Sequence, residues 1–335
     1  MMENQESNQN KEELKFENRI PLEGLKEAVE SLKSQLSKVI VGQDNFVELL
    51  IVGLLSNGHV LIEGVPGVAK TVTAKLFAKC LKTNFSRIQF TPDLMPSDVL
   101  GTNIFNTKLS EFEFKKGPVF SNIVLIDEIN RAPAKTQAAL FEVMEERQVT
   151  MDGKLHKMDA PFMVLATQNP IEQEGTYALP EAQLDRFLFK IEVGYPELED
   201  EVKILQTHHE RKGKLPETEV EAVLEPSKLK ELRDQIHEII IEEKLLNYIA
   251  ELINKTRNHP HLYLGASPRA SISVMNASKS FAAVNGRDFV IPEDIKNSLK
   301  PVLAHRLILS PDREMEGMTA ANVIDMITQS VEIPR

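Results

Sequence analysis

The chain has 335 residues, of which 42% are hydrophobic and 27% charged, which is typical of a globular protein with one large domain and a smaller one. Its formal net charge of −11 argues against a broad nucleic-acid-binding surface, because neutralising phosphates requires clustered lysine and arginine. Cys80 is the single cysteine, so an intramolecular disulfide is excluded and a reducing compartment is expected.

The sequence shows no targeting or membrane-spanning segment. Its N-terminal residues are polar, and the most apolar run, from Leu49 to Leu55, is far shorter than the roughly 20 residues that span a bilayer. We therefore expect a cytoplasmic protein without membrane insertion.

Residues 1–20 are polar and predict a flexible tail. From Pro21 to Val39, apolar residues recur at three- and four-residue spacing, which predicts a helix; a second helix is expected over 43–56. Strands and helices then alternate, and this predicts a parallel sheet with helices on both faces. The expected strands are 59–63, 86–90, 123–127, 162–168 and 187–192, and the expected helices between them are 69–81 and 134–146.

Two insertions interrupt this alternation. Residues 91–121 contain the alternating run Glu111-Phe-Glu-Phe114 among several turn signals, and they predict a helix broken by a β-hairpin. Between Arg147 and Pro161, the pair Asp152-Gly153 separates two short strand-like runs and predicts a second hairpin. Long ordered excursions from a compact domain are often functional.

Beyond Glu192 the apolar residues follow helical stripes, one from Leu229, another from Leu245, and a third helix begins at Ser267-Pro268. The pattern predicts an α/β core over 21–195 and a smaller, all-α domain over 196–335. Residues 211–227, rich in Lys, Glu and Pro, are expected to form its longest loop.

A strand leading into Gly64-Val-Pro-Gly-Val-Ala-Lys-Thr71 predicts a phosphate-binding loop, whose backbone N–H groups and following helix N-terminus attract an anion. Lys70 is expected to bind the β- and γ-phosphates, and Thr71 to ligate Mg²⁺. Ala69 stands where the usual pattern has glycine, and it costs nothing sterically if its backbone angles are helical. The expected nucleotide-binding residues of this segment are Gly64, Val65, Pro66, Gly67, Val68, Ala69, Lys70, Thr71 and Val72.

A second apolar strand ends in Asp127-Glu128. Asp127 is expected to hold Mg²⁺ through its water shell, and Glu128 to polarise the attacking water. Gln89, at the end of another strand, is a candidate to orient Glu128 in the resting state. Together the two motifs predict Mg²⁺-dependent binding and hydrolysis of ATP.

The ordered motifs resemble the MoxR family of AAA+ ATPases, from about residue 21 to 309. After the phosphate loop they are Leu125-Ile-Asp-Glu-Ile-Asn-Arg131-Ala-Pro, Ala166-Thr-Gln-Asn169-Pro, Leu179-Pro-Glu-Ala-Gln-Leu-Asp-Arg186-Phe and Gly265-Ala-Ser-Pro-Arg269-Ala. The resemblance implies an AAA+ P-loop core with two hairpin insertions, followed by a helical lid.

The same resemblance implies roles for single residues. Asn169 corresponds to sensor 1, Arg186 to the arginine finger that enters a neighbouring subunit's site, and Arg269 to sensor 2. Val41 and Gly42 lie in the segment expected against the adenine. Arg131 is a second candidate trans-acting arginine, and whether Arg131 and Arg269 act within or between subunits stays open.

A finger that acts in trans implies a ring, most often a hexamer, with ATP at each interface. The family is associated with chaperone-like maturation of protein partners, often ones with a von Willebrand factor A domain. Two alternatives remain: a nucleic-acid motor, and a slow nucleotide-gated subunit like that of a chelatase. The acidic chain and the mixed charges of both hairpins make a nucleic-acid partner the less favoured reading.

Overall fold

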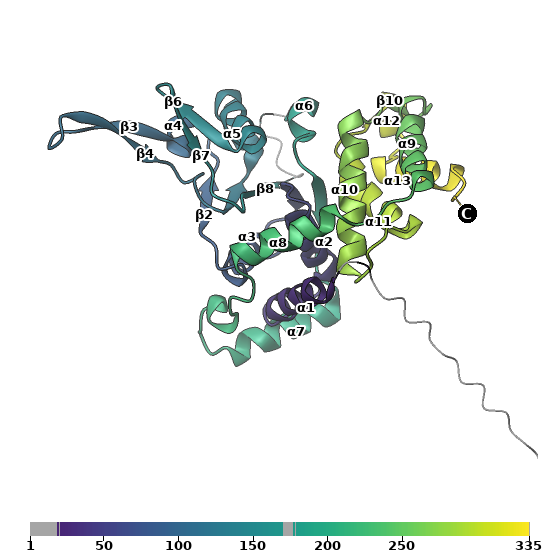
Figure 1. Cartoon of the computed structure of the whole chain (residues 1–335), viewed down its shortest axis with the longest axis horizontal. Helices are drawn as coiled ribbons and strands as arrows, with labels where there is room; N and C mark the ends of the chain where they lie inside the picture. The colour runs from purple at the N-terminus through teal and green to yellow at the C-terminus, as the bar shows by residue number, and fades with distance from the viewer. Residues whose placement is uncertain (1–18, 20, 170–176, 178, 335) are drawn as a thin grey trace, which may run out of the picture.

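The computed structural model describes residues 19, 21–169, 177 and 179–334, and its centre is a five-stranded parallel sheet (Figure 1). The strand order is β2-β5-β8-β1-β9. The strands are β1 (Val60–Gly64), β2 (Phe85–Gln89), β5 (Ile123–Asp127), β8 (Met163–Gln168) and β9 (Phe189–Val193). The expected sheet is therefore confirmed, and every strand end lies within two residues of the predicted one. The predicted tail 1–20 lies outside the described residues, apart from Arg19.

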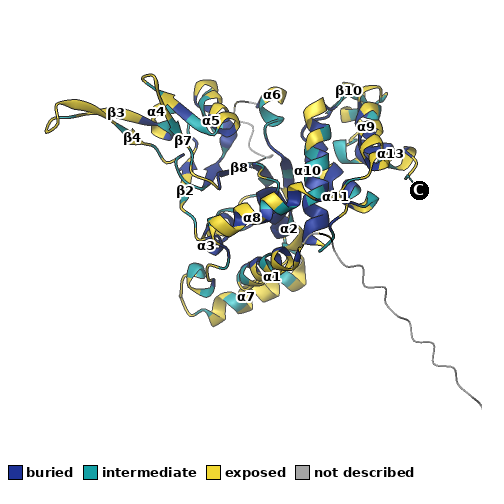
Figure 2. Ribbon diagram, in the orientation of Figure 1, coloured by how far each residue is buried: buried dark blue, intermediate teal, exposed yellow. Residues whose placement is uncertain are grey.

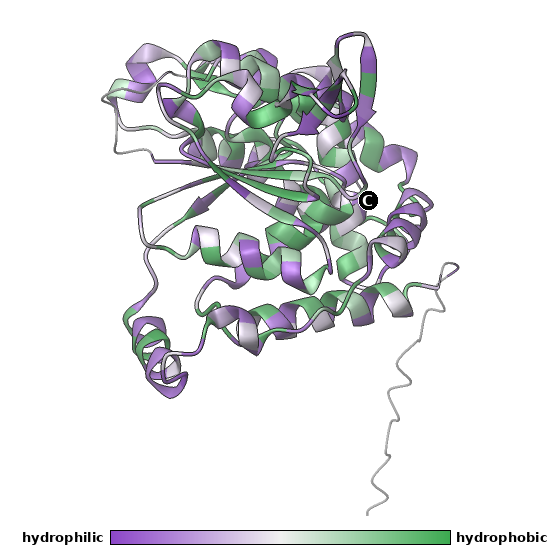
Figure 3. Ribbon diagram, turned by 90° about the vertical axis from the view of Figure 1, so that its left-hand side faces the viewer, coloured by the Kyte–Doolittle hydropathy of each residue, from purple (hydrophilic) through white to green (hydrophobic). Residues whose placement is uncertain are grey.

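Helices cover both faces of this sheet, as expected. Neighbouring residues of a strand point to opposite faces. Ile62 and Leu125 join one apolar cluster with α1, α2 and α3, whereas Leu61 and Val124 join a second cluster with α5. The sheet accordingly forms the apolar middle layer (Figure 3). These helices are α1 (Glu23–Ser37), α2 (Asp44–Leu55), α3 (Lys70–Cys80) and α5 (Ala134–Glu146).

Both predicted hairpins are present. The first insertion comprises α4 (Pro96–Leu100), β3 (Gly101–Asn106) and β4 (Glu111–Lys116), and the second comprises β6 (Gln148–Met151) and β7 (Lys154–Lys157). The β3–β4 hairpin projects from the body and is largely exposed (Figure 2). The hairpins contact each other: Asn103 donates a hydrogen bond to Asp152, and the rings of Phe114 and His156 lie 4.3 Å apart.

The chain after β9 is mainly helical, as predicted, and also contains two short antiparallel strands that the sequence did not reveal. In Figure 1, α10 lies between the sheet and α9. The helices are α7 (Leu198–Glu210), α8 (Pro226–His237), α9 (Glu243–Arg257), α10 (Pro268–Val284), α11 (Pro292–Leu303), α12 (Pro311–Met315) and α13 (Ala320–Ser330). The strands are β10 (Leu262–Leu264) and β11 (Ile308–Leu309), and a 3-10 turn, η2, covers Pro216–Glu219.

The connection between α7 and α8 is anchored to the core. Backbone N–H groups of Val223 and Leu224 donate to the Cys80 carbonyl at 2.8 and 3.1 Å, and Leu224 is buried. The Cys80 side chain is buried, and burial raises the pKa of its thiol to about 11. The domain boundary near residue 196 stays a prediction. Among the described helices, none is long and apolar enough to cross a membrane.

Candidate active site

The phosphate-binding loop connects the carboxyl end of β1 with the first turn of α3. Gly64 admits no side chain, because a Cβ there would collide with the Val193 carbonyl oxygen of β9. The Lys70 ammonium donates to the Gly64 carbonyl at 2.6 Å, across the loop. Burial lowers the pKa of Lys70, while the nearby carboxylates of Asp127 and Glu128 oppose this shift. The lysine is thus held at the mouth of the loop, where a phosphate is expected.

Ala69 does not have the helical backbone angles at which alanine would have no steric cost relative to glycine. Its φ of 57° and ψ of 16° lie in the left-handed region, so the condition under which alanine would have no steric cost here is not met. The conformation aims the Ala69 carbonyl along α3, where it accepts from the Thr73 amide at 2.9 Å and from the Thr73 hydroxyl at 3.0 Å. The turn into the helix requires this strain.

Exchanging Ala69 for glycine is expected to raise the free energy of unfolding by about 0.5–1 kcal/mol, because glycine adopts the left-handed region without a Cβ clash. Ala78→Gly, inside α3, is the matched control and should lower it by about 1 kcal/mol. Urea unfolding followed by circular dichroism measures both. A loss of stability with Ala69→Gly similar to that of the control would contradict the left-handed assignment.

Asp127 ends β5 and is 7% exposed. It accepts a hydrogen bond from Arg87 Nε at 2.5 Å and another from Thr167 Oγ1 at 3.2 Å. The Thr167 hydroxyl in turn accepts from the Glu128 backbone amide at 3.0 Å. Two residues that the sequence did not single out, Arg87 and Thr167, therefore fix the two acidic residues at the end of β5.

Glu128 has a φ of 57° and a ψ of 54°, a left-handed conformation that is strained for a residue other than glycine. Its Oε2 atom accepts from Gln89 Nε2 at 2.8 Å and pairs with Arg131 Nε at 3.1 Å. The contact expected between Gln89 and Glu128 is present, and Arg131 lies at its own subunit's phosphate edge.

Further expected residues lie at this same edge. Gln43 Nε2 donates to the Val68 carbonyl at 3.0 Å, which holds the segment with Val41 and Gly42 against the phosphate loop. A Cβ on Gly42 would lie 2.5 Å from Asp200 Oδ2, so α7 closes over this segment. Asn169 directly follows β8, whose last residue is level with the end of β1. A hollow of about 620 Å³ adjoins the loop and is lined by Glu63, Gly64, Val65, Glu192, Val193 and Gly194.

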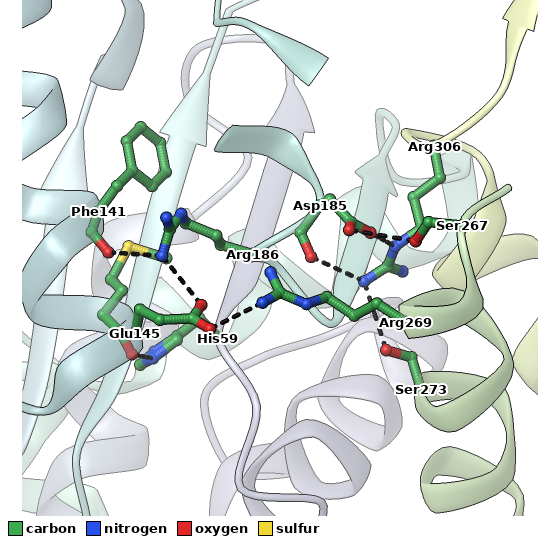
Figure 4. Close-up of polar contacts among 10 residues, drawn as sticks. His59, Phe141, Glu145, Asp185, Arg186, Ser267, Arg269, Ser273 and Arg306 are labelled. Carbon is green, nitrogen blue, oxygen red and sulfur yellow. Dashed lines mark hydrogen bonds and ion pairs between the residues drawn. The ribbon is translucent and has the colours of Figure 1, made fainter. Parts of the chain in front are cut away.

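Arg186 and Arg269 lie elsewhere and share one carboxylate (Figure 4). Arg186 precedes β9, and Arg269 lies in the first turn of α10. Arg186 Nη1 contacts Glu145 Oε2 at 2.9 Å, and Arg269 Nη2 contacts Glu145 Oε1 at 2.7 Å. The hollow around them, of about 270 Å³, is also lined by Gly58 and His59, the residues immediately before β1.

The phosphate loop and the two arginines therefore lie at opposite ends of β1. A five-residue strand spans about 16 Å, which exceeds the length of an arginine side chain. The structure brings the phosphate loop, Asp127, Glu128 and Asn169 to one edge of the sheet, and it does not bring Arg186 or Arg269 to that edge.

Comparisons with known proteins agree with this architecture. A family model described as the ATPase family associated with various cellular activities (AAA) matches residues 59–189, and an AAA lid domain model matches residues 254–327. Chaperone MoxR1 of Mycobacterium tuberculosis is 45% identical over 325 residues, covering 93% of this chain and 85% of the relative. The chain belongs to the MoxR family of AAA+ ATPases.

Other similar proteins support the same family and fold. Protein MoxR of Methylorubrum extorquens is 30% identical, covering 92% of this chain and 96% of the relative, and the uncharacterized protein YeaC of Bacillus subtilis is 44% identical, covering 89% and 92%. A crystal structure of a candidate ATPase from Cytophaga hutchinsonii superposes with a TM-score of 0.86 at 42% identity, covering 92% of this chain and 96% of that one. Nucleotide binding follows from membership of this ATPase family.

One residue that the sequence did not reveal joins the lid of this MoxR-family protein to the segment that carries Arg186. Arg306 donates to Asp185 Oδ1 at 2.6 Å, to the Phe187 carbonyl at 2.7 Å and to the Leu188 carbonyl at 3.1 Å. Burial lowers the pKa of Arg306, although the Asp185 carboxylate opposes this shift. The backbone on both sides of Arg186 is thereby fixed to the lid.

His59 has a structural environment. It is 5% exposed, its Nδ1 accepts from the Val164 amide at 2.9 Å, and its Nε2 lies 3.1 Å from the Met144 carbonyl. Burial lowers its pKa to about 3, so the ring is neutral near pH 7 and its Nε2–H donates to Met144. His59 thus joins the start of β1 to β8 and to the end of α5.

Proposed function

We propose that this MoxR-family protein hydrolyses ATP in a Mg²⁺-dependent reaction at interfaces between the subunits of a ring, and uses the reaction to remodel a protein partner. The observation that supports it most is the placement of the phosphate loop and the arginine pair at opposite edges of one sheet. A complete site then requires two copies of the chain, joined head to tail.

Within one subunit, the phosphate loop and Lys70 bind the phosphates, and Thr71 and Asp127 would hold Mg²⁺. A hydroxyl and a carboxylate are oxygen donors of the kind that this ion prefers. No cluster of three or more His, Cys, Asp or Glu among residues 19, 21–169, 177 and 179–334 forms a self-sufficient metal site. The ion would therefore share its coordination with phosphate oxygens and water, and when bound it neutralises charge on the transferring phosphoryl group.

Glu128 is proposed to polarise the attacking water, with Asn169 beside it. An amide can donate to a phosphate oxygen and accept from water at the same time. The contacts of Glu128 with Gln89 and Arg131 support a resting position from which its carboxylate turns to reach the water. The strained backbone of Glu128 is of the kind that occurs at functional sites.

Arg186 and Arg269 are proposed to act together in trans, on the ATP of the next subunit. Their shared contact with Glu145, at the edge away from Lys70, supports a common target. Two permanently charged, planar guanidinium groups stabilise the negative charge that develops on the phosphoryl oxygens. The dipole of α10 adds to the attraction of Arg269 for phosphate, because this arginine lies in the first turn of the helix.

A protein partner is proposed to contact the hairpins, in the cytoplasm, and one with a von Willebrand factor A domain is a candidate. Phe105 and Phe112 pack edge to face on β3–β4, with ring centroids 5.3 Å apart, yet are 50% and 69% exposed. Ile104, Leu109 and Leu155 are further exposed apolar residues of the two hairpins. Apolar side chains exposed together are typical of protein-binding sites, and the relative from Mycobacterium tuberculosis is named a chaperone.

The partner is tested by capture on a Glu128→Gln variant, which is expected to bind ATP and retain what it engages. Exchanging both Phe105 and Phe112 for serine in that background should lower partner retention at least about tenfold, the effect of losing one well-buried aromatic contact. In the wild-type background the same exchange should leave basal ATP hydrolysis nearly unchanged. Met315→Ser is the matched control, since Met315 is an exposed apolar residue (88%) in the lid.

Two outcomes would contradict the proposed function and favour another. Loss of basal hydrolysis on exchanging the phenylalanines would assign the hairpin to the active site or the subunit interface. Salt-sensitive binding of single-stranded DNA that the same exchange removes would favour the nucleic-acid motor.

A further inference from the structure

We propose that in a separate subunit the Glu145 carboxylate bridges Arg186 and Arg269 and occupies the place taken by the neighbouring subunit's phosphate on assembly. The inference rests on the proposed action of both arginines in trans. The Glu145 carboxylate would compete with the phosphate of the neighbouring subunit for the same two arginines. This competition would set the protein concentration at which subunits assemble.

The geometry around Glu145 supports this role (Figure 4). Each carboxylate oxygen serves one arginine: Oε2 lies 2.9 Å from Arg186 Nη1, and Oε1 lies 2.7 Å from Arg269 Nη2. The three side chains come from α5, from the segment before β9, and from α10 in the lid. One acidic group therefore fixes the distance between two cations that would otherwise repel each other.

A carboxylate that bridges two guanidinium groups resembles two oxygens of a phosphate that bridges the same groups. The hollow around Glu145 also contains Arg147 and Arg306, so four arginines and two acidic residues, Glu145 and Asp185, line it. This excess of positive charge attracts anions although the chain as a whole carries −11. A terminal phosphate, with more negative charge than one carboxylate, is the anion expected to displace Glu145.

The two acidic residues of this hollow differ in how easily they can exchange partners. The side chains of Glu145, Arg186 and Arg269 are 39%, 30% and 46% exposed. Water can therefore take the place of a partner in either ion pair at little cost in free energy. Asp185, by contrast, is paired with Arg306, whose side chain is only 3% exposed. Separating this ion pair would therefore cost much more free energy. The exchangeable anion is therefore Glu145, and the Asp185–Arg306 pair is a fixed support.

Exchanging Glu145 for glutamine is therefore expected to favour assembly. The measurement is the protein concentration at half-assembly, by sedimentation velocity with Mg²⁺ and ATP, in a Glu128→Gln background that does not consume the nucleotide. Glu145→Gln should lower this concentration about fivefold, which corresponds to ~1 kcal/mol. A merely structural role for Glu145 predicts the opposite sign, because losing the clamp would weaken the interface.

Two variants test the bridging geometry. Glu146→Gln, at the next position of α5, which is also exposed, changes the net charge by the same amount and should leave the half-assembly concentration unchanged. Glu145→Asp keeps the charge but shortens the side chain, so it should shift the concentration part of the way towards that of Glu145→Gln. An unchanged or raised concentration for Glu145→Gln, an equal shift for Glu146→Gln, or wild-type behaviour of Glu145→Asp would each overturn the proposal.

The test separates this inference from the function on which it rests. If Arg186→Ala and Arg269→Ala are combined, the shift caused by Glu145→Gln should disappear. A shift that persists would overturn the role of Glu145 and leave ring assembly intact. If the Glu128→Gln protein with Glu145 intact fails to assemble with ATP at any concentration, the proposed function itself is wrong.

Discussion

Exchanging Arg186 for alanine is expected to lower the ATP turnover number of the assembled protein by about 10³-fold or more, the range known for arginines that act in trans on a phosphoryl group. The affinity of a separate subunit for ATP should stay nearly unchanged, because Arg186 lies at the edge of the sheet away from Lys70. Steady-state ATPase rates at saturating protein concentration and equilibrium binding of a fluorescent ATP analogue measure the two quantities.

Mixing gives the decisive control for Arg186. Neither Arg186→Ala nor Glu128→Gln should turn over ATP alone, yet an interface between them places an intact Arg186 against an intact Glu128 and should restore part of the activity. Mixing Glu128→Gln with the double variant Arg186→Ala, Glu128→Gln is the matched control, since no intact Glu128 is present. A mixture that co-assembles and remains inactive would show that Arg186 is not a shared catalytic group.

The Lys70→Ala and Glu128→Gln variants are expected to separate binding from turnover. Lys70→Ala should weaken ATP binding about 100-fold, because a charged donor to the phosphates in the ground state is lost. Glu128→Gln should keep the affinity and lower the turnover number about 10²- to 10⁴-fold, since its carboxylate acts on water in the transition state. Tight binding by Lys70→Ala or wild-type turnover by Glu128→Gln would refute these assignments.

A third variant provides the control for both. Lys75, also on α3, pairs with Glu217 instead of facing the phosphate loop. Lys75→Ala removes one positive charge from the same helix and should change neither ATP affinity nor turnover by more than about twofold, as expected for an exposed ion pair. If Lys75→Ala lowered ATP affinity as much as Lys70→Ala, the loss would come from the removed positive charge in general and not from a contact of Lys70 with phosphate.

The elements that sequence predicted well are those set by local patterning. Alternating apolar strands and amphipathic helices encode the sheet, and the phosphate loop and the Asp127-Glu128 pair occupy consecutive positions at strand ends. The left-handed angles of Ala69 could not be predicted, because they belong to the turn into α3 and are not favoured by the residue type. The short β10–β11 pair was missed because two- and three-residue strands carry no detectable period.

The arginine cluster could be predicted only in part, because its contacts join distant segments. Glu145 is 41 residues from Arg186 and 124 from Arg269 in sequence, and Arg306 is 121 residues from Asp185. The family motifs identified Arg186 and Arg269 individually. No spacing in one sequence indicates that they share a carboxylate, or that a lid arginine supports the backbone beside them.

If the arginine pair acts in trans as proposed, its placement opposite the phosphate loop makes the number of working sites depend on whether the ring closes. Each subunit has a donor end, which carries the arginines, and an acceptor end, which carries ATP. An open row of n subunits leaves one acceptor end without a donor and so has n−1 complete sites, whereas a closed ring has n. Activity per subunit would then rise with each addition to an open row, and adding more subunits could raise it no further once the ring closes.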